Sequence, residues 1–343
     1  MKKMKVLVFA MMMLLLAACG NGDKAPEASG DATAEAGNKI VFKLSNVFNT
    51  TQPLNITLEE VAQRVKERTN GAIEIQIYGN GEIATYKDGI EQVRNGAYFM
   101  SNEDPSYMGD WVPEFNALVG PMLYDSMEEY SAMCHSAYAE ELMQKAYEQG
   151  MKVLALDYGF GFRHICGNKP YLTPEELNGV KLRVPKSNLW IQTLTAMGAS
   201  PVPQAWSEVY AAVQQGVVDG LETSISDIAD NKMGAIIKDI SMTGHFCGTT
   251  CVVMSAKVWD ELTEEQQKIL WEEFQAGAIR NNERVAELEA KDRKDLEAEG
   301  VKFHEVDKAP FRERTKVVFD QIENLPAGTY DRIQEELTKI RNH

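Results

Sequence analysis

The sequence carries little positive charge for its length of 343 residues. Lys and Arg number 35 against 51 Asp and Glu, which gives a formal net charge of −16. So acidic a chain is poorly suited to bind nucleic acid or anionic lipid, and both are excluded as main partners. An anionic small molecule is not excluded. Exposed charges are screened beyond about 8 Å at physiological salt, so a local pair of arginines can outweigh the remote total.

Motifs that carry catalysis are also missing. The sequence has no H-E-x-x-H, no G-x-S-x-G and no P-loop, and Gly159-Phe160-Gly161 lacks the third glycine of a dinucleotide fingerprint. The five histidines are scattered, and His164 and His245 lie near apolar residues, which favours hydrogen-bonded structural roles. A binding protein rather than an enzyme is therefore expected. Because carboxylate pairs leave no sequence signature, a surface hydrolase or lyase using Glu103 or Asp104 remains the alternative.

Cysteine is scarce, and no C-x-x-C is present. Apart from Cys19, the four cysteines are Cys134, Cys166, Cys247 and Cys251. On one strand Cys247 and Cys251 would share a face but lie about 13 Å apart, too far to form a disulfide. Buried free thiols are expected, while a Cys134–Cys166 disulfide stays open. No metal site is expected, because no histidine stands at ligand spacing to these cysteines.

Long apolar runs are absent except near the N-terminus. Three lysines within the first five residues precede an apolar run over residues 6–18. This run is too short for a spanning helix and predicts a secretory signal over residues 1–18. Leu16-Ala17-Ala18-Cys19 resembles a bacterial lipobox, in which the cysteine is diacylated and becomes the first residue. The alternative is an ordinary signal peptide with a chance cysteine at its end.

Residues 19–38 contain no aromatic or large aliphatic side chain, which predicts a flexible lipidated leash. The protein is thus expected outside the cytoplasm, attached by lipid at Cys19 to the cell membrane or exposed to a periplasm.

Beyond residue 38, strand and helix patterns alternate. Period-two apolar patterns and apolar runs predict strands near residues 40–44, 73–77, 98–100, 153–156 and 180–184. Helices are predicted from Thr57 to Gly71, over 88–94, 126–149 and 207–215, and from Thr263 to about Gly300, with a capping box at Thr173-Pro174-Glu175-Glu176. The alternation predicts mostly parallel sheets flanked by helices, and the length fits two lobes.

Arg183 is the most informative polar residue. It alternates with Leu182 and Val184, so its side chain points to the opposite face of the strand. That face is usually buried under helices, where an arginine needs an acidic partner. An ion pair within the protein, or a solvated strand end, would account for it equally well. Arg163 by itself would be a surface charge, and Trp206 is either core packing or the apolar wall of a pocket.

Several ordered, correctly spaced segments resemble the extracytoplasmic solute receptors of TRAP (tripartite ATP-independent periplasmic) transporters. The likeness runs from Lys39 onward, and its segments are Gly161-Phe162-Arg163, Leu177 to Pro185, Gly198 to Pro203, Ser207 to Tyr210 and Gln215 to Gly220.

The resemblance implies a two-lobed α/β fold of the type II periplasmic-binding-protein kind. Each lobe would hold a mixed, mostly parallel sheet flanked by helices, with a long connecting helix. Lobe I is expected to comprise residues 39–160 and 249–288, and lobe II residues 161–248 and 289–343.

The implied function is that of a monomeric receptor without a cofactor. It would close on a small organic acid, either a sugar acid such as a uronate or aldonate or a C4-dicarboxylate, and deliver it to TRAP membrane subunits driven by an ion gradient. A receptor for another importer or for a sensor remains the alternative within binding proteins.

The resemblance also implies roles for single residues. Arg183 would form a bidentate pair with the ligand carboxylate, and Arg163 would add a second contact. Asn46, Glu103 and Trp206 correspond to ligand-contacting positions in relatives. Glu103, as an acceptor-only carboxylate, would favour ligand hydroxyls or an ammonium group and repel a second carboxylate.

Two further candidates are departures from the family pattern. Thr223-Ser224 replaces an asparagine-proline pair of sialic-acid-type receptors, and Thr85-Tyr86 replaces an acidic pair. Thr223 and Tyr86 therefore argue against sialic acid as the ligand.

Overall fold

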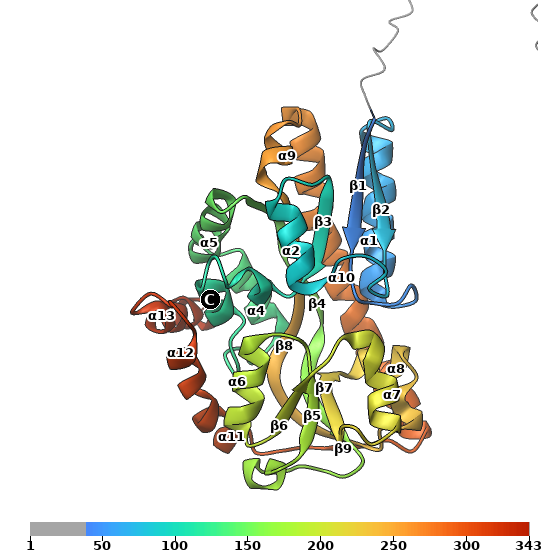
Figure 1. The fold of residues 1–343 in the computed structure, drawn as a ribbon, viewed down its shortest axis with the longest axis vertical. Coiled ribbons are helices and arrows are strands. Elements are labelled where there is room, and N and C mark those ends of the chain that lie inside the picture. The colour runs from blue at the N-terminus through green and yellow to red at the C-terminus, as the bar shows by residue number, and fades with distance from the viewer. Residues whose placement is uncertain (1–38, 343) are drawn as a thin grey trace, which may run out of the picture. The chain divides into compact units, whose positions relative to one another are not determined.

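The computed structural model describes residues 39–342 (Figure 1). The predicted signal sequence, the leash and the lipidation site at Cys19 lie outside these residues and stay predictions.

Strands within residues 39–342 form one hydrogen-bonded network in the order β2-β1-β3-β8-β4-β7-β5-β6, with β9 paired to β8. Their bounds are β1 Ile40–Ser45, β2 Ile73–Tyr78, β3 Phe99–Glu103, β4 Met151–Gly167, β5 Lys181–Val184, β6 Ser200–Pro203, β7 Gly220–Ser224, β8 Asp239–Ser255 and β9 Lys302–His304. The pairs β1·β2, β1·β3, β5·β6, β5·β7 and β8·β9 are parallel, whereas β8 pairs antiparallel with β3 and β4, and β4 with β7. The sheet is mixed, as expected.

The two longest strands, β4 and β8, connect two lobes. Their pairing runs from Met151 opposite Ser255, beside β3, to Gly167 opposite Asp239, beside β7 and β9, and shifts register four times on the way (Figure 1). At one shift the strands approach so closely that a Cβ on Gly248 would lie 2.4 Å from the carbonyl oxygen of Gly161. Position 248 can therefore be occupied only by glycine.

Helices cover the strands of both lobes. Their bounds are α1 Pro53–Arg68, α2 Tyr86–Arg94, α3 Glu114–Leu118, α4 Met127–Cys134, α5 Ala137–Glu148, α6 Asn188–Met197, α7 Val209–Gln214, α8 Ile225–Asp230, α9 Ala256–Asp260, α10 Glu264–Ala298, α11 Lys308–Thr315, α12 Val317–Gln321 and α13 Thr329–Arg341. Short 3₁₀ turns begin at Pro105, Pro174, Trp206 and Met233. None of the described helices is both long and apolar enough to cross a membrane.

Local capping explains where predictions of helices succeed or fail. The capping box of Thr263 and Gln266 opens α10 as predicted, and the helix runs without a break for 35 residues, a point that the sequence left open. The first helix begins at Pro53 rather than Thr57, because the Gln52 side chain caps it. The predicted 126–149 helix is two helices, since Ser136 caps a new one. The capping box predicted at Thr173 is wrong: its side chain makes no cap hydrogen bond and only a 3₁₀ turn forms.

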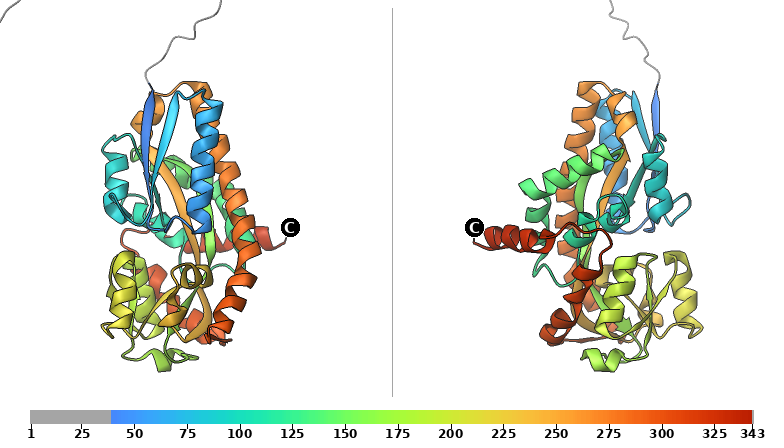
Figure 2. Two further views of the ribbon diagram at one scale, coloured as in Figure 1. Left: turned by 90° about the vertical axis from the view of Figure 1, so that its right-hand side faces the viewer. Right: turned by 60° about the vertical axis from the view of Figure 1, so that its left-hand side comes forward.

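Helix α10 packs along β4 and also contacts α1 and α8, so it links the lobes (Figure 2). Two adjacent side chains hold it to β4. Asn281 Nδ2 donates to the carbonyl of Gly159 at 2.6 Å, and Asn282 both accepts from the Gly159 amide at 2.8 Å and donates to the carbonyl of Asp157 at 2.9 Å. These bonds satisfy backbone groups that the irregular β4–β8 pairing leaves free.

The apolar core of the described residues comprises three clusters, of which the largest contains residues of both predicted lobes, such as Phe99 and Leu182. One cluster joins β1, α1 and α10 through residues such as Phe42, Leu58 and Phe274, and another joins β7 and α8 through Leu221 and Ile228. The exact lobe boundaries stay a prediction. The C-terminal helix α13 contacts α3 and α4, which belong to the predicted lobe I, although residues 289–343 are predicted in lobe II. All four cysteines in the described residues are buried free thiols, so the Cys134–Cys166 disulfide is not formed.

Candidate functional site

A small cavity of about 60 Å³ is lined by residues from both lobes. The lining residues are Val47, Phe48, Tyr86, Glu103, Asp104, Tyr107, Phe160, Arg163, Arg183, Pro185, Trp190, Trp206, Thr223, Asp227, Thr249 and Thr250. Six of the seven side chains proposed from the sequence are among them. Asn46 is the exception. It is fully buried beside the cavity, donating to Asn55 Oδ1 at 2.9 Å and accepting from the Phe48 amide at 2.9 Å.

Arg183, on β5, is 2% exposed. Its Nε and Nη2 donate to the carbonyl oxygen of Gln204 at 3.1 and 2.7 Å, and its guanidinium lies 5.3 Å from the centre of the Trp206 ring. No carboxylate in residues 39–342 forms an ion pair with it, and burial lowers its pKa. A buried cation without a counter-charge is costly, so an anion entering the cavity would be stabilised there.

Arg163, on β4, is already neutralised. Its Nε and Nη2 bind the two carboxylate oxygens of Glu222 on β7 at 2.6 and 2.7 Å, and Nη2 also donates to the Glu222 carbonyl at 3.0 Å. Burial alone would raise the pKa of Glu222, but the charge and hydrogen bonds of Arg163 lower it to about 2. Arg163 is 6% exposed, so the surface position considered for it is wrong. The two arginines differ because Arg163 has an ion-pair partner in the protein and Arg183 has none in the described residues.

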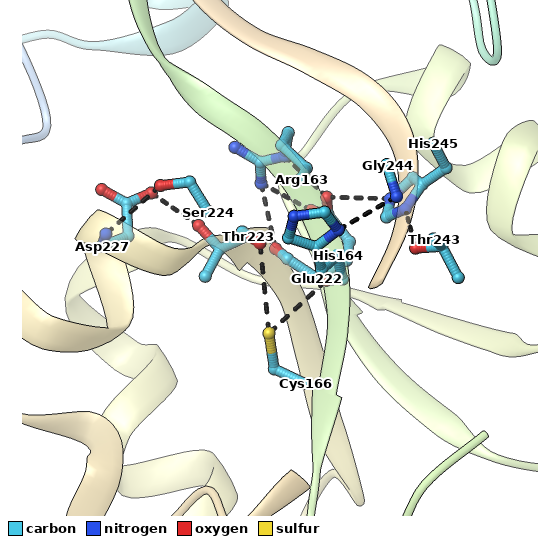
Figure 3. A network of polar contacts seen from close by, with 10 residues as sticks. All are labelled: Arg163, His164, Cys166, Glu222, Thr223, Ser224, Asp227, Thr243, Gly244 and His245. Atoms are coloured by element: carbon cyan, nitrogen blue, oxygen red, sulfur yellow. Dashed lines mark hydrogen bonds and ion pairs between the residues drawn. The ribbon is translucent and has the colours of Figure 1, made fainter. Parts of the chain in front are cut away.

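Two buried histidines lie near this pair, and one of them approaches Glu222 (Figure 3). His245 Nε2 lies 3.4 Å from a Glu222 oxygen, and its Nδ1 shares a 2.8 Å hydrogen bond with the Thr243 hydroxyl. His164 Nδ1 accepts from the Gly244 amide at 3.0 Å. Burial lowers the pKa of both imidazoles, so neither adds charge. The expected structural role of His164 and His245 agrees with these contacts.

Glu103 ends β3 and is 2% exposed. Its Oε1 accepts from the Tyr86 amide at 2.7 Å, and burial raises its pKa to about 8. Glu103 is therefore largely protonated near neutral pH and can donate a hydrogen bond as well as accept one, unlike the acceptor-only carboxylate expected from the sequence.

Tyr86 and Trp206 connect the two lobes at the cavity. The Trp206 amide donates to the Tyr86 hydroxyl at 2.9 Å, and the Tyr86 ring lies 5.5 Å from that of Tyr107. Trp206 is partly exposed and forms a wall of the cavity next to Arg183, which is the pocket alternative considered for it. Tyr86 also has a φ of +55°, an uncommon conformation outside glycine.

Sequence reasoning missed several lining residues, above all Asp227. It lies in α8, four residues after Thr223, whose hydroxyl donates to Asp227 Oδ2 at 2.5 Å. Burial raises the pKa of Asp227 to about 6, and that of Asp104, whose Oδ1 accepts from the Ser106 amide, also to about 6. The sequence signal that could have indicated Asp227 is a strand that ends at Thr223-Ser224 directly before a helix. Thr249 and Thr250 belong to β8, a strand considered from the sequence only as a condition for the placement of Cys247 and Cys251.

Within residues 39–342 no group of three His, Cys, Asp or Glu side chains could hold a metal ion. Among the described residues, the cavity offers the buried charge of Arg183, several carboxyl and hydroxyl groups, and aromatic walls contributed by both lobes. These features define a two-lobed solute-binding protein.

Comparison with known proteins names the family. Residues 44–324 match the bacterial extracellular solute-binding protein family 7, and the chain belongs to this family. It is a TRAP solute-binding protein and, like its periplasmic relatives, acts outside the cytoplasm with membrane subunits.

Three solved structures of TRAP periplasmic solute-binding proteins are similar. The one from Fusobacterium nucleatum, with bound sn-glycerol 3-phosphate, is 41% identical with a TM-score of 0.86, covering 88% of this chain and 98% of that one. The one from Desulfovibrio salexigens, with diglycerolphosphate, is 41% identical with a TM-score of 0.87, covering 89% and 98%. The one from Actinobacillus succinogenes, with L-galactonate, is 26% identical with a TM-score of 0.83, covering 87% and 99%.

Proposed function

We propose that this receptor binds a small organic anion rich in hydroxyl groups, with the single acid group of the ligand held by Arg183. The free buried charge of Arg183 carries the proposal. A planar guanidinium matches the paired oxygens of a carboxylate or phosphate. The ligand would therefore supply the counter-charge that no carboxylate of the described residues provides to Arg183.

The carboxyl groups of the cavity further narrow the range of possible ligands. Glu103, Asp104 and Asp227 all line it, while Arg163 is already paired with Glu222. A second acid group on the ligand would meet the carboxylates of Asp104 and Asp227 without a free cation, which disfavours a C4-dicarboxylate. Hydroxyl groups would be good partners for them. Polyol phosphates such as sn-glycerol 3-phosphate are the first candidates, since the two 41%-identical structures hold such ligands. Sugar acids such as L-galactonate are the second.

Titration calorimetry tests this proposal. The panel contains sn-glycerol 3-phosphate, diglycerol phosphate, L-galactonate, succinate and, as an uncharged control, glycerol. We expect binding of a hydroxylated anion and none of glycerol, with succinate much weaker. Tight binding of succinate alone, or of glycerol as strongly as its phosphate, would overturn the ligand class.

We further propose that the receptor releases the bound ligand chemically unchanged to its TRAP carrier. The family consists of solute-binding proteins. Mass spectrometry of the ligand after long incubation checks this, and any hydrolysis or elimination product would favour the enzyme alternative. Genes for a small and a large membrane subunit beside this gene are the expected genomic context.

Attachment through Cys19 is also part of the proposal. A lipid at Cys19 would keep the receptor at the membrane and raise its effective concentration near its carrier. Cys19→Ser should abolish incorporation of labelled palmitate and move the protein from the membrane fraction to the soluble one. Unchanged membrane attachment of this variant would exclude lipid anchoring at Cys19.

A further inference from the structure

Asp227 has one carboxylate oxygen that the fold leaves unused. Its Oδ2 accepts from the Thr223 hydroxyl at 2.5 Å, and its backbone amide donates to Ser224 Oγ at 3.2 Å (Figure 3). The residue is 3% exposed and lines the same cavity as Arg183. Its other oxygen, Oδ1, is buried and accepts no hydrogen bond within residues 39–342.

The neighbouring cation donates no hydrogen bond to this oxygen. Burial raises the pKa of Asp227 and the charge of Arg163 partly offsets this rise, but the Nε and Nη2 of Arg163 bind Glu222. In Figure 3 Asp227 and Thr223 lie on one side of Arg163, and the histidine that contacts Glu222 lies on the other. A buried acceptor without a donor destabilises the protein unless something else supplies the donor.

A ligand hydroxyl is the donor that suits this position. The carboxylate accepts hydrogen bonds from O–H groups and repels anionic oxygens. Arg183, in contrast, donates hydrogen bonds and attracts anionic oxygens. Arg183 and Asp227 come from neighbouring elements, since β5 pairs with β7 and α8 follows β7 directly. The cavity therefore offers an anion site and a hydroxyl site to the same small molecule.

We propose that Asp227 is a specificity-determining residue whose Oδ1 accepts a hydrogen bond from a ligand hydroxyl, while Arg183 holds the acid group of that ligand. Thr223 positions the carboxylate through its bond to Oδ2. The inference rests on the proposed function, because it assumes a hydroxylated anion at Arg183.

Calorimetry on matched variants and ligands tests the assignment. The variants are Asp227→Ala and the shape-conserving Asp227→Asn, with Asp219→Asn as control, an exposed aspartate of the same lobe outside the cavity. The probes are sn-glycerol 3-phosphate and its two deoxy analogues, each lacking one hydroxyl. If the wild type binds L-galactonate instead, its singly deoxygenated analogues serve in the same way. Thermal unfolding establishes that each variant is folded.

Loss of one charge-assisted hydrogen bond should weaken binding of the hydroxylated probe roughly 10- to 100-fold in Asp227→Ala, and less in Asp227→Asn. For one of the two deoxy analogues the same substitution should change Kd less than about threefold, because the bond is already absent. Equal weakening for all three probes, or none in either variant, would overturn the role of Asp227. A wild type that binds no anion of the panel would instead refute the proposed function.

Discussion

Replacing Arg183 with glutamine should remove most of the anion affinity without unfolding the protein. Arg183 is 2% exposed, and no carboxylate pairs with it in the described residues. Its charge-assisted hydrogen bonds to the acid group should contribute about 2–4 kcal/mol, so calorimetry should show a Kd raised roughly 30- to 700-fold. The glutamine amide can still donate to the Gln204 carbonyl that Arg183 now binds, so little stability should be lost.

Arg163→Gln is the matched control, because it makes the same chemical change at a cavity arginine that is internally paired. It leaves the fully buried carboxylate of Glu222 without its counter-ion. Breaking a buried pair from one side costs about 3–5 kcal/mol, so urea denaturation should show a large loss in the free energy of unfolding.

The comparison of the two variants tests whether Arg183 is available to a ligand while Arg163 is held in an internal ion pair. We expect Arg183→Gln to affect mainly binding and Arg163→Gln mainly stability. Arg183→Gln protein that binds the anion as tightly as the wild type would refute the role assigned to Arg183. Equal losses in unfolding free energy would refute the distinction between a free and a paired arginine.

Further predictions concern the titration of buried carboxyl groups, the contact between α10 and β4, and the reactivity of the cysteine thiols. Because burial raises the pKa of Glu103 from 4.5 to about 8, its contribution to the free energy of unfolding is complete below pH 4.5 and lost as the pH rises to about 8. Asp104 and Asp227, with pKa values raised to about 6, act in the same sense at lower pH. In urea denaturation, Glu103→Gln should therefore reduce the decline between pH 4.5 and 6 and largely abolish the decline between pH 6 and 8. Asn282→Ala should lower the free energy of unfolding by about 1–3 kcal/mol, since it removes two hydrogen bonds to β4, and an unchanged urea midpoint would contradict that role. A thiol reagent should modify the buried cysteines only in denaturant, with rapid labelling of the native protein as the contrary result; these are Cys134, Cys166, Cys247 and Cys251.

Local patterns in the sequence determined much of this protein. Alternation of apolar residues located β1, β2 and β5, and the Thr263 capping box located the start of α10, because these signals act within a few residues. The same alternation turned Arg183 away from the apolar face of its strand. Ordered motifs then indicated the family, which the match over residues 44–324 confirms.

Tertiary structure decided the electrostatics of the site. Arg163 and Glu222 are 59 positions apart in sequence, and their pairing depends on the register of β4 against β7, which no local pattern specifies. The irregular β4–β8 pairing likewise depends on contacts between distant segments. Sequence alone therefore identified two arginines as candidates. Only the packing of distant strands neutralised one of them, left the charge of Arg183 free, and brought the unused oxygen of Asp227 into the same cavity.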